Sequence, residues 1–139
     1  MKLKSIIVLI FSLFLSTSIL MAQKISDASY RAIGYIKSDG TIQDGSYRTI
    51  GYIKSDGSVL DGNYKKIAIL KTDGSIQNAS YSTIGKIKND GTVTDAAYSV
   101  IGYVKTDGKV LDKNYKAIGY TENVPAAHAA LFFFFLKKN

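Results

Sequence analysis

Two aspartates recur through most of the chain, and their side chains are the ones best suited to acid–base chemistry. Asp39 and Asp44 form the first such pair, and equivalents follow at a fixed spacing. A catalytic pair of carboxyl groups needs two different environments that push their two pKa values apart. Nearly identical copies supply nearly identical environments. We therefore interpret these aspartates as turn-forming residues and not as catalysts.

Metal and nucleophile chemistry has little support in the sequence. The only histidine, His128, stands in an alanine-rich segment, and the chain has no cysteine. A zinc site needs several ligands close together, and a serine triad needs a histidine base. The glycine fingerprints of nucleotide sites are missing, and the Asp-Gly-Thr-Ile segment lacks the dense oxygen ligands of a calcium loop. The sequence predicts no enzyme, no cofactor and no metal site.

A repeat of 17 residues organises the chain. Each copy has a tyrosine, then an isoleucine three residues later, then a small residue. The tyrosines are Tyr30, Tyr47, Tyr64, Tyr81, Tyr98 and Tyr115. Five copies contain Asp-Gly, at Asp39 and Gly40, Asp56 and Gly57, Asp73 and Gly74, Asp90 and Gly91, and Asp107 and Gly108. Six copies at one period indicate a tandem-repeat protein.

Each repeat has the pattern of a β-hairpin. Residues 49–54 are β-branched and aromatic, which suits a strand, and residues 58–61 form a shorter one. The Asp-Gly between them predicts a turn with positive φ at these positions. Asp61 begins a second turn, in which its carboxylate can accept a bond from its own backbone. We expect about twelve strands of about four to six residues.

The faces of the strands follow from comparing copies. The position of Ile53 is apolar in all copies but one, so it is expected to be buried, whereas the position of Tyr52 also holds a lysine and should face water. Ile50 should then point outward, although it is isoleucine in every copy. Either a β-bulge turns both isoleucines inward, or Ile50 packs under Tyr64. The bulge is the preferred interpretation.

The C-terminal segment, residues 124–139, differs sharply from the repeats. It holds an alanine-rich stretch and four consecutive phenylalanines. Pro125 suits the first turn of a helix, with Asn123 as its cap. A helix that is apolar all round must be buried, and a ring of about twelve strands leaves a lumen that could hold it. We expect an all-β fold with one C-terminal helix in the lumen of a shallow barrel; the alternative is an open solenoid whose tail docks on one end or on a membrane.

The N-terminal segment predicts export. Residues 1–22 combine two lysines, an apolar stretch and a small residue at the end, which is typical of a signal peptide. An uncleaved membrane anchor is the alternative. Residues 23–123 then form the six-repeat β domain, in a protein that is periplasmic, in the outer envelope or secreted. The net charge of +7 is spread over the repeats, which argues against nucleic acid as a partner.

Repeats of this Tyr-x-x-Ile-Gly-Tyr-Ile-Lys type, followed by an apolar terminal helix, resemble the β-flower proteins. The likeness covers Ile25 to Leu136. More distantly, the arrangement is similar to the tubby and phospholipid-scramblase barrel, in which twelve strands enclose a C-terminal helix. The resemblance implies a shallow pseudo-symmetric barrel and an envelope setting. The basic phosphoinositide pocket of tubby domains has no counterpart here, so lipid-head-group binding does not carry over.

Tyrosines are the best candidates for a contact surface. The position that tolerates lysine holds Tyr35, Tyr52, Tyr103 and Tyr120, and a lysine follows two residues later in most copies. Such a surface could stack on sugars or meet anionic lipids; the alternative is that tyrosine covers the sheet and lysine protects strand edges. We expect a non-enzymatic envelope protein with a scaffold or binding role. The partner is unknown, and glycan, cell wall and membrane lipid remain open, as do a carbohydrate-binding module and a lipid-binding barrel held by the phenylalanine-rich tail.

Overall fold

The computed structural model describes residues 23–136, which form a closed barrel of twelve antiparallel strands and a short C-terminal helix. The strands are β1 (Lys24–Asp27), β2 (Ala32–Ile36), β3 (Thr41–Asp44), β4 (Thr49–Ile53), β5 (Ser58–Asp61), β6 (Lys66–Leu70), β7 (Ser75–Asn78), β8 (Thr83–Ile87), β9 (Thr92–Asp95), β10 (Val100–Val104), β11 (Lys109–Asp112) and β12 (Ala117–Glu122). Each strand pairs with its neighbours in sequence, and β1 pairs with β12 to close the ring. The predicted all-β class and closed barrel are confirmed. The predicted signal peptide lies outside the described residues.

The Asp-Gly turns join the longer strand of each hairpin to the shorter one. In the first, Gly40 donates its amide to the Lys37 carbonyl at 2.9 Å, and Lys37 donates to the Thr41 carbonyl at 2.9 Å. Gly40 has a φ of 90°, and the Asp39 carboxylate accepts from the Thr41 amide at 2.9 Å. This is a three-residue loop that ends in a left-handed residue. The predicted positive φ is confirmed at all five Asp-Gly glycines.

The second type of turn places a tyrosine in the left-handed region. Tyr47 donates to the Asp44 carbonyl at 3.0 Å and has a φ of 66°. The same conformation recurs at all six repeat tyrosines. It is rare for a bulky residue and costs about 1–2 kcal/mol. The Asp44 carboxylate offsets this cost, because it accepts from the amides of Ser46 at 2.9 Å and Arg48 at 3.0 Å.

A β-bulge interrupts every longer strand at the repeated isoleucine. In β4, Gly51 lies opposite Ile42 and Thr49 lies opposite Gln43, so Ile50 is the extra residue. The other five longer strands shift register at the equivalent position. A bulge of this kind redirects neighbouring side chains. The predicted bulge is confirmed, but Ile50 is not buried by it, since 43% of its surface stays exposed.

A ring of backbone hydrogen bonds links each Asp-Gly turn to the next hairpin. The Gly40 carbonyl accepts from the amide of Ile53 at 2.7 Å, and the other four turn glycines accept from equivalent amides. The Gln23 carbonyl takes the same role for Ile36, at 3.1 Å. Because Gln23 stands where a turn glycine would, this ring continues across the seam between the two ends of the chain.

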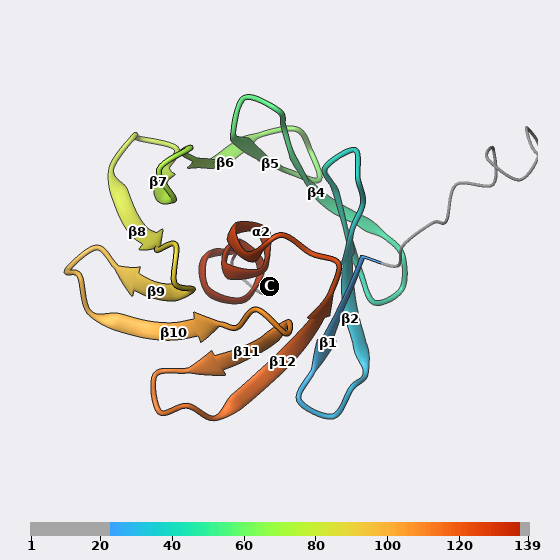
Figure 1. Cartoon of the computed structure of the whole chain (residues 1–139). Coiled ribbons are helices and arrows are strands. Elements are labelled where there is room, and N and C mark those ends of the chain that lie inside the picture. The colour runs from blue at the N-terminus through green and yellow to red at the C-terminus, as the bar shows by residue number, and fades with distance from the viewer. Residues whose placement is uncertain (1–22, 137–139) are drawn as a thin grey trace, which may run out of the picture.

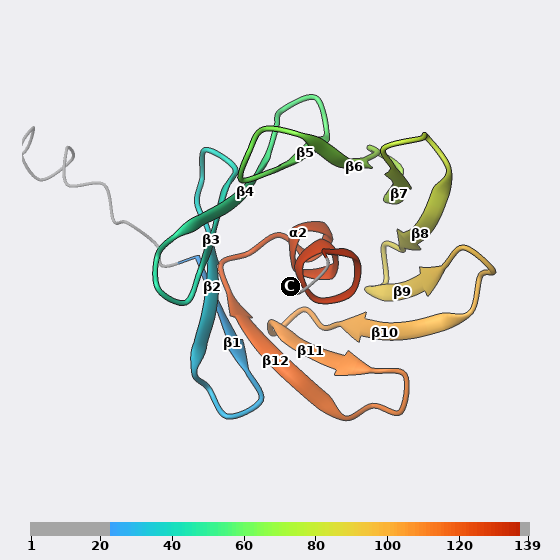
Figure 2. The same cartoon turned by 180° about the vertical axis from the view of Figure 1, so that it is seen from behind.

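The C-terminal helix stands inside the ring of strands in both views (Figures 1 and 2). It consists of α2 (Ala126–Ala130) and η1 (Leu131–Phe135). The side chains around Ala130 are fully buried, and Phe132 is 7% exposed. The predicted Asn123 cap is wrong: the N-cap position is Pro125, which makes no side-chain hydrogen bond. Asn123 has a φ of 57°, so it belongs to the bend before the helix and not to its first turn.

Candidate functional site

The four phenylalanines of the tail each face a different repeat. Phe132, Phe133, Phe134 and Phe135 lie against Gly34, Gly119, Gly102 and Gly85, in that order. These glycines belong to β2, β12, β10 and β8, which are successive longer strands around the ring. A Cβ at any of the four glycines would collide with a phenyl ring. The small residue of the repeat is therefore what allows the rings to pack against the strands.

The geometry of η1 explains how consecutive residues reach successive repeats. Leu136 donates its amide to the Leu131 carbonyl at 2.9 Å, a bond that spans five residues. An α-helix turns by about 100° per residue, whereas helices with this wider bonding turn by less. Six longer strands share the full turn of the ring, so neighbouring ones are about 60° apart around the barrel axis. A rotation per residue below that of an α-helix therefore brings each phenylalanine closer to the next longer strand. π-Helical turns of this kind are rare and lie frequently at functional sites.

Two repeats receive no phenylalanine, and a cavity of about 1290 Å³ lies beside them. Their small residues are Gly51 and Ala68, and the atoms nearest a Cβ at Gly51 come from strands and not from the tail. Ile50 and Ile67 line this cavity and are 43% and 38% exposed. We call the lumen beside these four residues the open sector, and the lumen beside the four phenylalanines the covered sector.

The wall of the open sector is apolar toward the helix. The edges of Phe132 and Phe135 and the side chain of Leu136 close one side of the cavity. Ile33 and Ile84 line its flanks and also pack against the core. The cavity therefore lies between the terminal helix and strands β4 and β6.

Charged residues stand at the turn end of the same cavity. They are Asp44, Arg48, Asp61, Lys65 and Lys66. Arg48 forms an ion pair with Asp44 at 2.9 Å, an exposed contact of the kind that contributes little to stability. The ammonium group of Lys66 lies 5.9 Å from the centroid of the Tyr81 ring.

Both carboxylates at this rim are committed to turns. The hydrogen bond from the Arg48 amide lowers the pKa of Asp44 below its usual value. The Asp61 carboxylate accepts from the amides of Asn63 at 2.8 Å and Lys65 at 3.0 Å. Both carboxylates stay ionised, and with three basic side chains beside them the rim carries a net charge of +1.

The predicted contact tyrosines are half-buried and stack on the turn tyrosines. The ring centroids are 4.6 Å apart for Tyr35 and Tyr47, 4.7 Å for Tyr52 and Tyr64, 4.7 Å for Tyr103 and Tyr115, and 4.2 Å for Tyr120 and Tyr30. In three pairs the hydroxyl groups are 3.1 Å apart. The hydrogen bond with Tyr64 raises the pKa of Tyr52. One face of each predicted contact residue is thus covered by its partner.

Sequence reasoning missed these stacked pairs. The signal was a separation of 12 residues between strand tyrosine and turn tyrosine in three of the four pairs; the fourth, Tyr120 with Tyr30, crosses the seam between the chain ends. Two copies break the pattern, with Ile69 and Lys86 in place of the strand tyrosine. Tyr98, the turn tyrosine that corresponds to Lys86, is 86% exposed. Tyr81, which corresponds to Ile69, is 63% exposed, close to the stacked turn tyrosines, so the larger exposure is confined to the copy with lysine.

The predicted turn aspartates lie in the turns. A backbone hydrogen bond lowers the pKa of Asp39, and the same cause acts first on Asp56, Asp73 and Asp90. Burial lowers the pKa of His128. Within residues 23–136, no group of three or more His, Cys, Asp or Glu side chains is placed to hold a metal ion. In the same part of the chain, none of the helices has the length and apolar character needed to cross a membrane.

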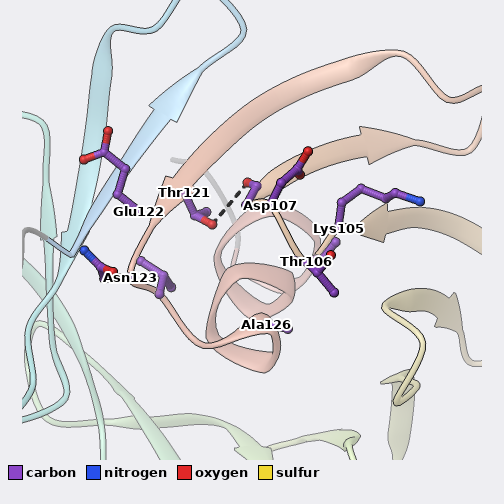
Figure 3. A pocket seen from close by; sticks show the side chains of 10 residues that line it. Lys105, Thr106, Asp107, Thr121, Glu122, Asn123 and Ala126 are labelled. Atoms are coloured by element: carbon purple, nitrogen blue, oxygen red, sulfur yellow. Dashed lines mark hydrogen bonds between the residues drawn. The ribbon is translucent and has the colours of Figure 1, made fainter.

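A smaller hollow of about 560 Å³ lies where the turn between β10 and β11 meets the segment before α2 (Figure 3). The Thr121 hydroxyl donates to the Gly108 carbonyl across it at 3.2 Å. The Lys105 side chain extends away from the helix. The polar groups that line this smaller hollow do not converge on one point, so the open sector is the better candidate site.

A closed ring of bulged hairpins around a terminal helix defines a pseudo-symmetric β-barrel repeat protein. The chain belongs to the 5-fold beta-flower protein family, whose family model matches residues 22–137. The predicted resemblance to β-flower proteins is confirmed. Five is also the number of Asp-Gly hairpins here, and β1 and β12 add one further pair that joins the chain ends. Neither the curated proteins nor the solved structures give a significant match.

Proposed function

We propose that this protein is a non-enzymatic, exported binding protein of the cell envelope, and that the open sector is its binding site. The observation that carries the proposal is the cavity of about 1290 Å³ between the terminal helix and strands β4 and β6. Ligand sites are concave and mostly apolar, with a few polar groups and volumes of about 300–1000 Å³. The open sector has this character and is large enough.

The surroundings of the cavity support a site that exists before the ligand arrives. The barrel is closed, and the helix is fixed by four rings packed against four strands. The bulges hold Ile50 and Ile67 at the cavity, where they stay partly exposed to water. A bound apolar ligand would remove this surface from water, which contributes about 25 cal/mol per Å².

Two further observations favour binding over catalysis and favour export. The turn aspartates are held by backbone amides, so their carboxylates are engaged in structure. His128 lies on the terminal helix and does not line the open sector. Residues 1–22 have the composition of a signal peptide.

The test is a titration with the neutral fluorescent dye N-phenyl-1-naphthylamine. The protein is expressed from its full 139-residue sequence. We expect saturable binding at one site, weakened at least about tenfold by Ala68→Phe, because a ring from β6 would fill the open sector. The matched control is Val100→Phe, since Val100 is 38% exposed and does not line the cavity. Equal binding by wild type and Ala68→Phe would refute the proposal.

A carbohydrate-binding module is the second candidate, favoured by the ring of exposed turn tyrosines. Tyr98 presents the most exposed ring, and the other five turn tyrosines are also exposed. Aromatic faces of this kind can stack on sugars. Pull-down on peptidoglycan with wild type and with Tyr98→Ser tests this surface, and clean negatives for wild type would remove the candidate. The third candidate, a barrel held on a membrane by its tail, is less favoured because the phenylalanines pack against the strands.

A further inference from the structure

The position of the open sector restricts the shape of its ligand. The lining runs from Gly51 and Ala68 in the lumen to Arg48 and Ser80 at the turn end of the strands. One long side of this space is the terminal helix, whose Phe132 and Leu136 contribute to the wall. A ligand that fills it must be elongated, with one end in the lumen and the other end at the rim.

The two ends of this space differ in polarity. The lumen end is walled by isoleucines, phenylalanine edges and small residues, with no ionisable side chain among them. The rim end carries all five charged residues of the lining. An elongated ligand with one apolar end and one polar end matches this distribution.

The sign of the rim charge selects the polar end of the ligand. Asp44 is paired with Arg48, and Asp61 accepts from two amides, so the two lysines that follow Asp61 give the rim its one excess positive charge. The Lys66 ammonium lies 5.9 Å from the centroid of the Tyr81 ring, so it must turn away from that ring to meet a ligand. Lys65 and Lys66 are the only adjacent pair of basic residues at this turn among the six repeats, and the two repeats that face Phe134 and Phe135 have serine in the place of Lys65. The doublet therefore coincides with the open sector. An anionic group is the complement of this rim.

We infer that the open sector binds a single-chain anionic amphiphile, a long-chain fatty acid, with its alkyl chain against Ile50, Ile67 and Ala68 and its carboxylate between Lys65 and Lys66. This inference rests on the proposed function, because it names the ligand class of the same site. The alkyl chain takes the place that a phenyl ring occupies in the covered sector. The carboxylate lies at the rim, where it keeps contact with water and with the two ammonium groups.

The test is displacement of N-phenyl-1-naphthylamine at pH 8 by hexadecanoic acid, hexadecan-1-ol and hexadecylamine. We expect the acid to bind at least about tenfold more tightly than the alcohol or the amine. In the series from decanoic to hexadecanoic acid, each methylene should strengthen binding up to roughly fourfold until the chain fills the sector. The double variant Lys65→Gln with Lys66→Gln should lose the advantage of the acid and keep the affinity for the alcohol. The control is Lys88→Gln with Lys105→Gln, two lysines away from this cavity.

The outcomes separate the two proposals. If the dye binds and Ala68→Phe blocks it, but acid and alcohol compete equally, the ligand class is wrong and the binding function stands. If wild-type protein binds neither the dye nor the acid, both proposals fail. If the protein floats with phosphatidylglycerol vesicles while hexadecanoic acid does not displace the dye, the lysines serve a membrane surface, and the inference is overturned.

Discussion

The covered and open sectors are built from equivalent strands, turns and bulges of different repeats, yet they differ in what the bulged isoleucines contact. Ile33, Ile84 and Ile101 pack against the core, whereas Ile50 and Ile67 are exposed to the cavity. The repeat thus builds the frame, and the non-repeating tail decides which parts of it are filled. Four consecutive phenylalanines cover four repeats and leave two open.

Replacement of one phenylalanine of the covered sector should give the largest change in the free energy of unfolding. Phe132→Ala removes a ring that is 7% exposed, and we expect a loss of about 3–5 kcal/mol in the free energy of unfolding. Ile67→Ala in the open sector should cost less than about 1 kcal/mol, since the side chain is already partly exposed. Urea denaturation of both variants measures the contrast. Equal losses would mean that the two sectors are equally packed.

A methyl group added to the small residue tests the contact between ring and strand more finely. In both Gly102→Ala and Gly51→Ala, the new Cβ would lie 2.6 Å from a strand carbonyl, that of Leu111 or Leu60. Only Gly102 also faces a phenyl ring, that of Phe134. We expect Gly102→Ala to cost about 1–3 kcal/mol more than Gly51→Ala in thermal or urea unfolding. A difference near zero would show that the ring yields without cost.

The outer surface offers a comparison of repeats with and without a stacked tyrosine pair. Lys86→Tyr would give the exposed Tyr98 the partner that Tyr103 gives to Tyr115. We expect a gain of about 0.5–1.5 kcal/mol in the free energy of unfolding, because stacked aromatic pairs contribute this much. Lys88→Tyr, two residues further along, is the control and should give no gain. Identical stabilities of the two variants would argue against the stack as a source of stability.

The smallest expected effect is a pH dependence that originates in the terminal helix. Burial lowers the pKa of His128 below its usual 6.5, so the native state binds fewer protons than the unfolded state in acid. The stability from this group is therefore present above pH 6.5 and is lost as the pH falls below that value. His128→Gln should remove this loss in melting curves recorded between pH 7.5 and pH 5. The turn aspartates titrate at and below their usual pKa of 3.8, so they do not contribute to the change in stability between pH 7.5 and pH 5.

Local patterns were enough to predict most of the frame. The Asp-Gly dipeptides specify positive φ, and the contrast between Ile50 and Tyr52 indicates a bulge, because both depend on neighbours in sequence. The left-handed tyrosines could not be predicted in this way. The backbone preference of tyrosine opposes the left-handed conformation. In the turn of Tyr47, that conformation is stabilised by hydrogen bonds to the Asp44 carboxylate and by stacking on Tyr35 of the neighbouring strand.

The open sector could not be predicted either, because it depends on how far the helix rotates from one residue to the next. That rotation is a property of η1 in its packed state and leaves no periodic signal in four identical phenylalanines. Two traces were present in the sequence. Ala68 is the one small residue that is not glycine, and Lys66 is the one lysine at its position in the repeat. Both belong to one of the two repeats whose small residue does not lie opposite a phenylalanine as the four glycines of the covered sector do.

The pairing of Lys24 with Glu122 has a consequence for how this protein reaches its native state. All twelve strands have a pairing partner that is adjacent in sequence, and such local hairpins form quickly. The seam is different, because it joins the two extremes of the chain and must overcome the entropy of a very long loop. We therefore expect the pairing of β1 with β12 to form last. The rate of this barrel closure should determine how long the apolar C-terminal segment stays exposed to aggregation.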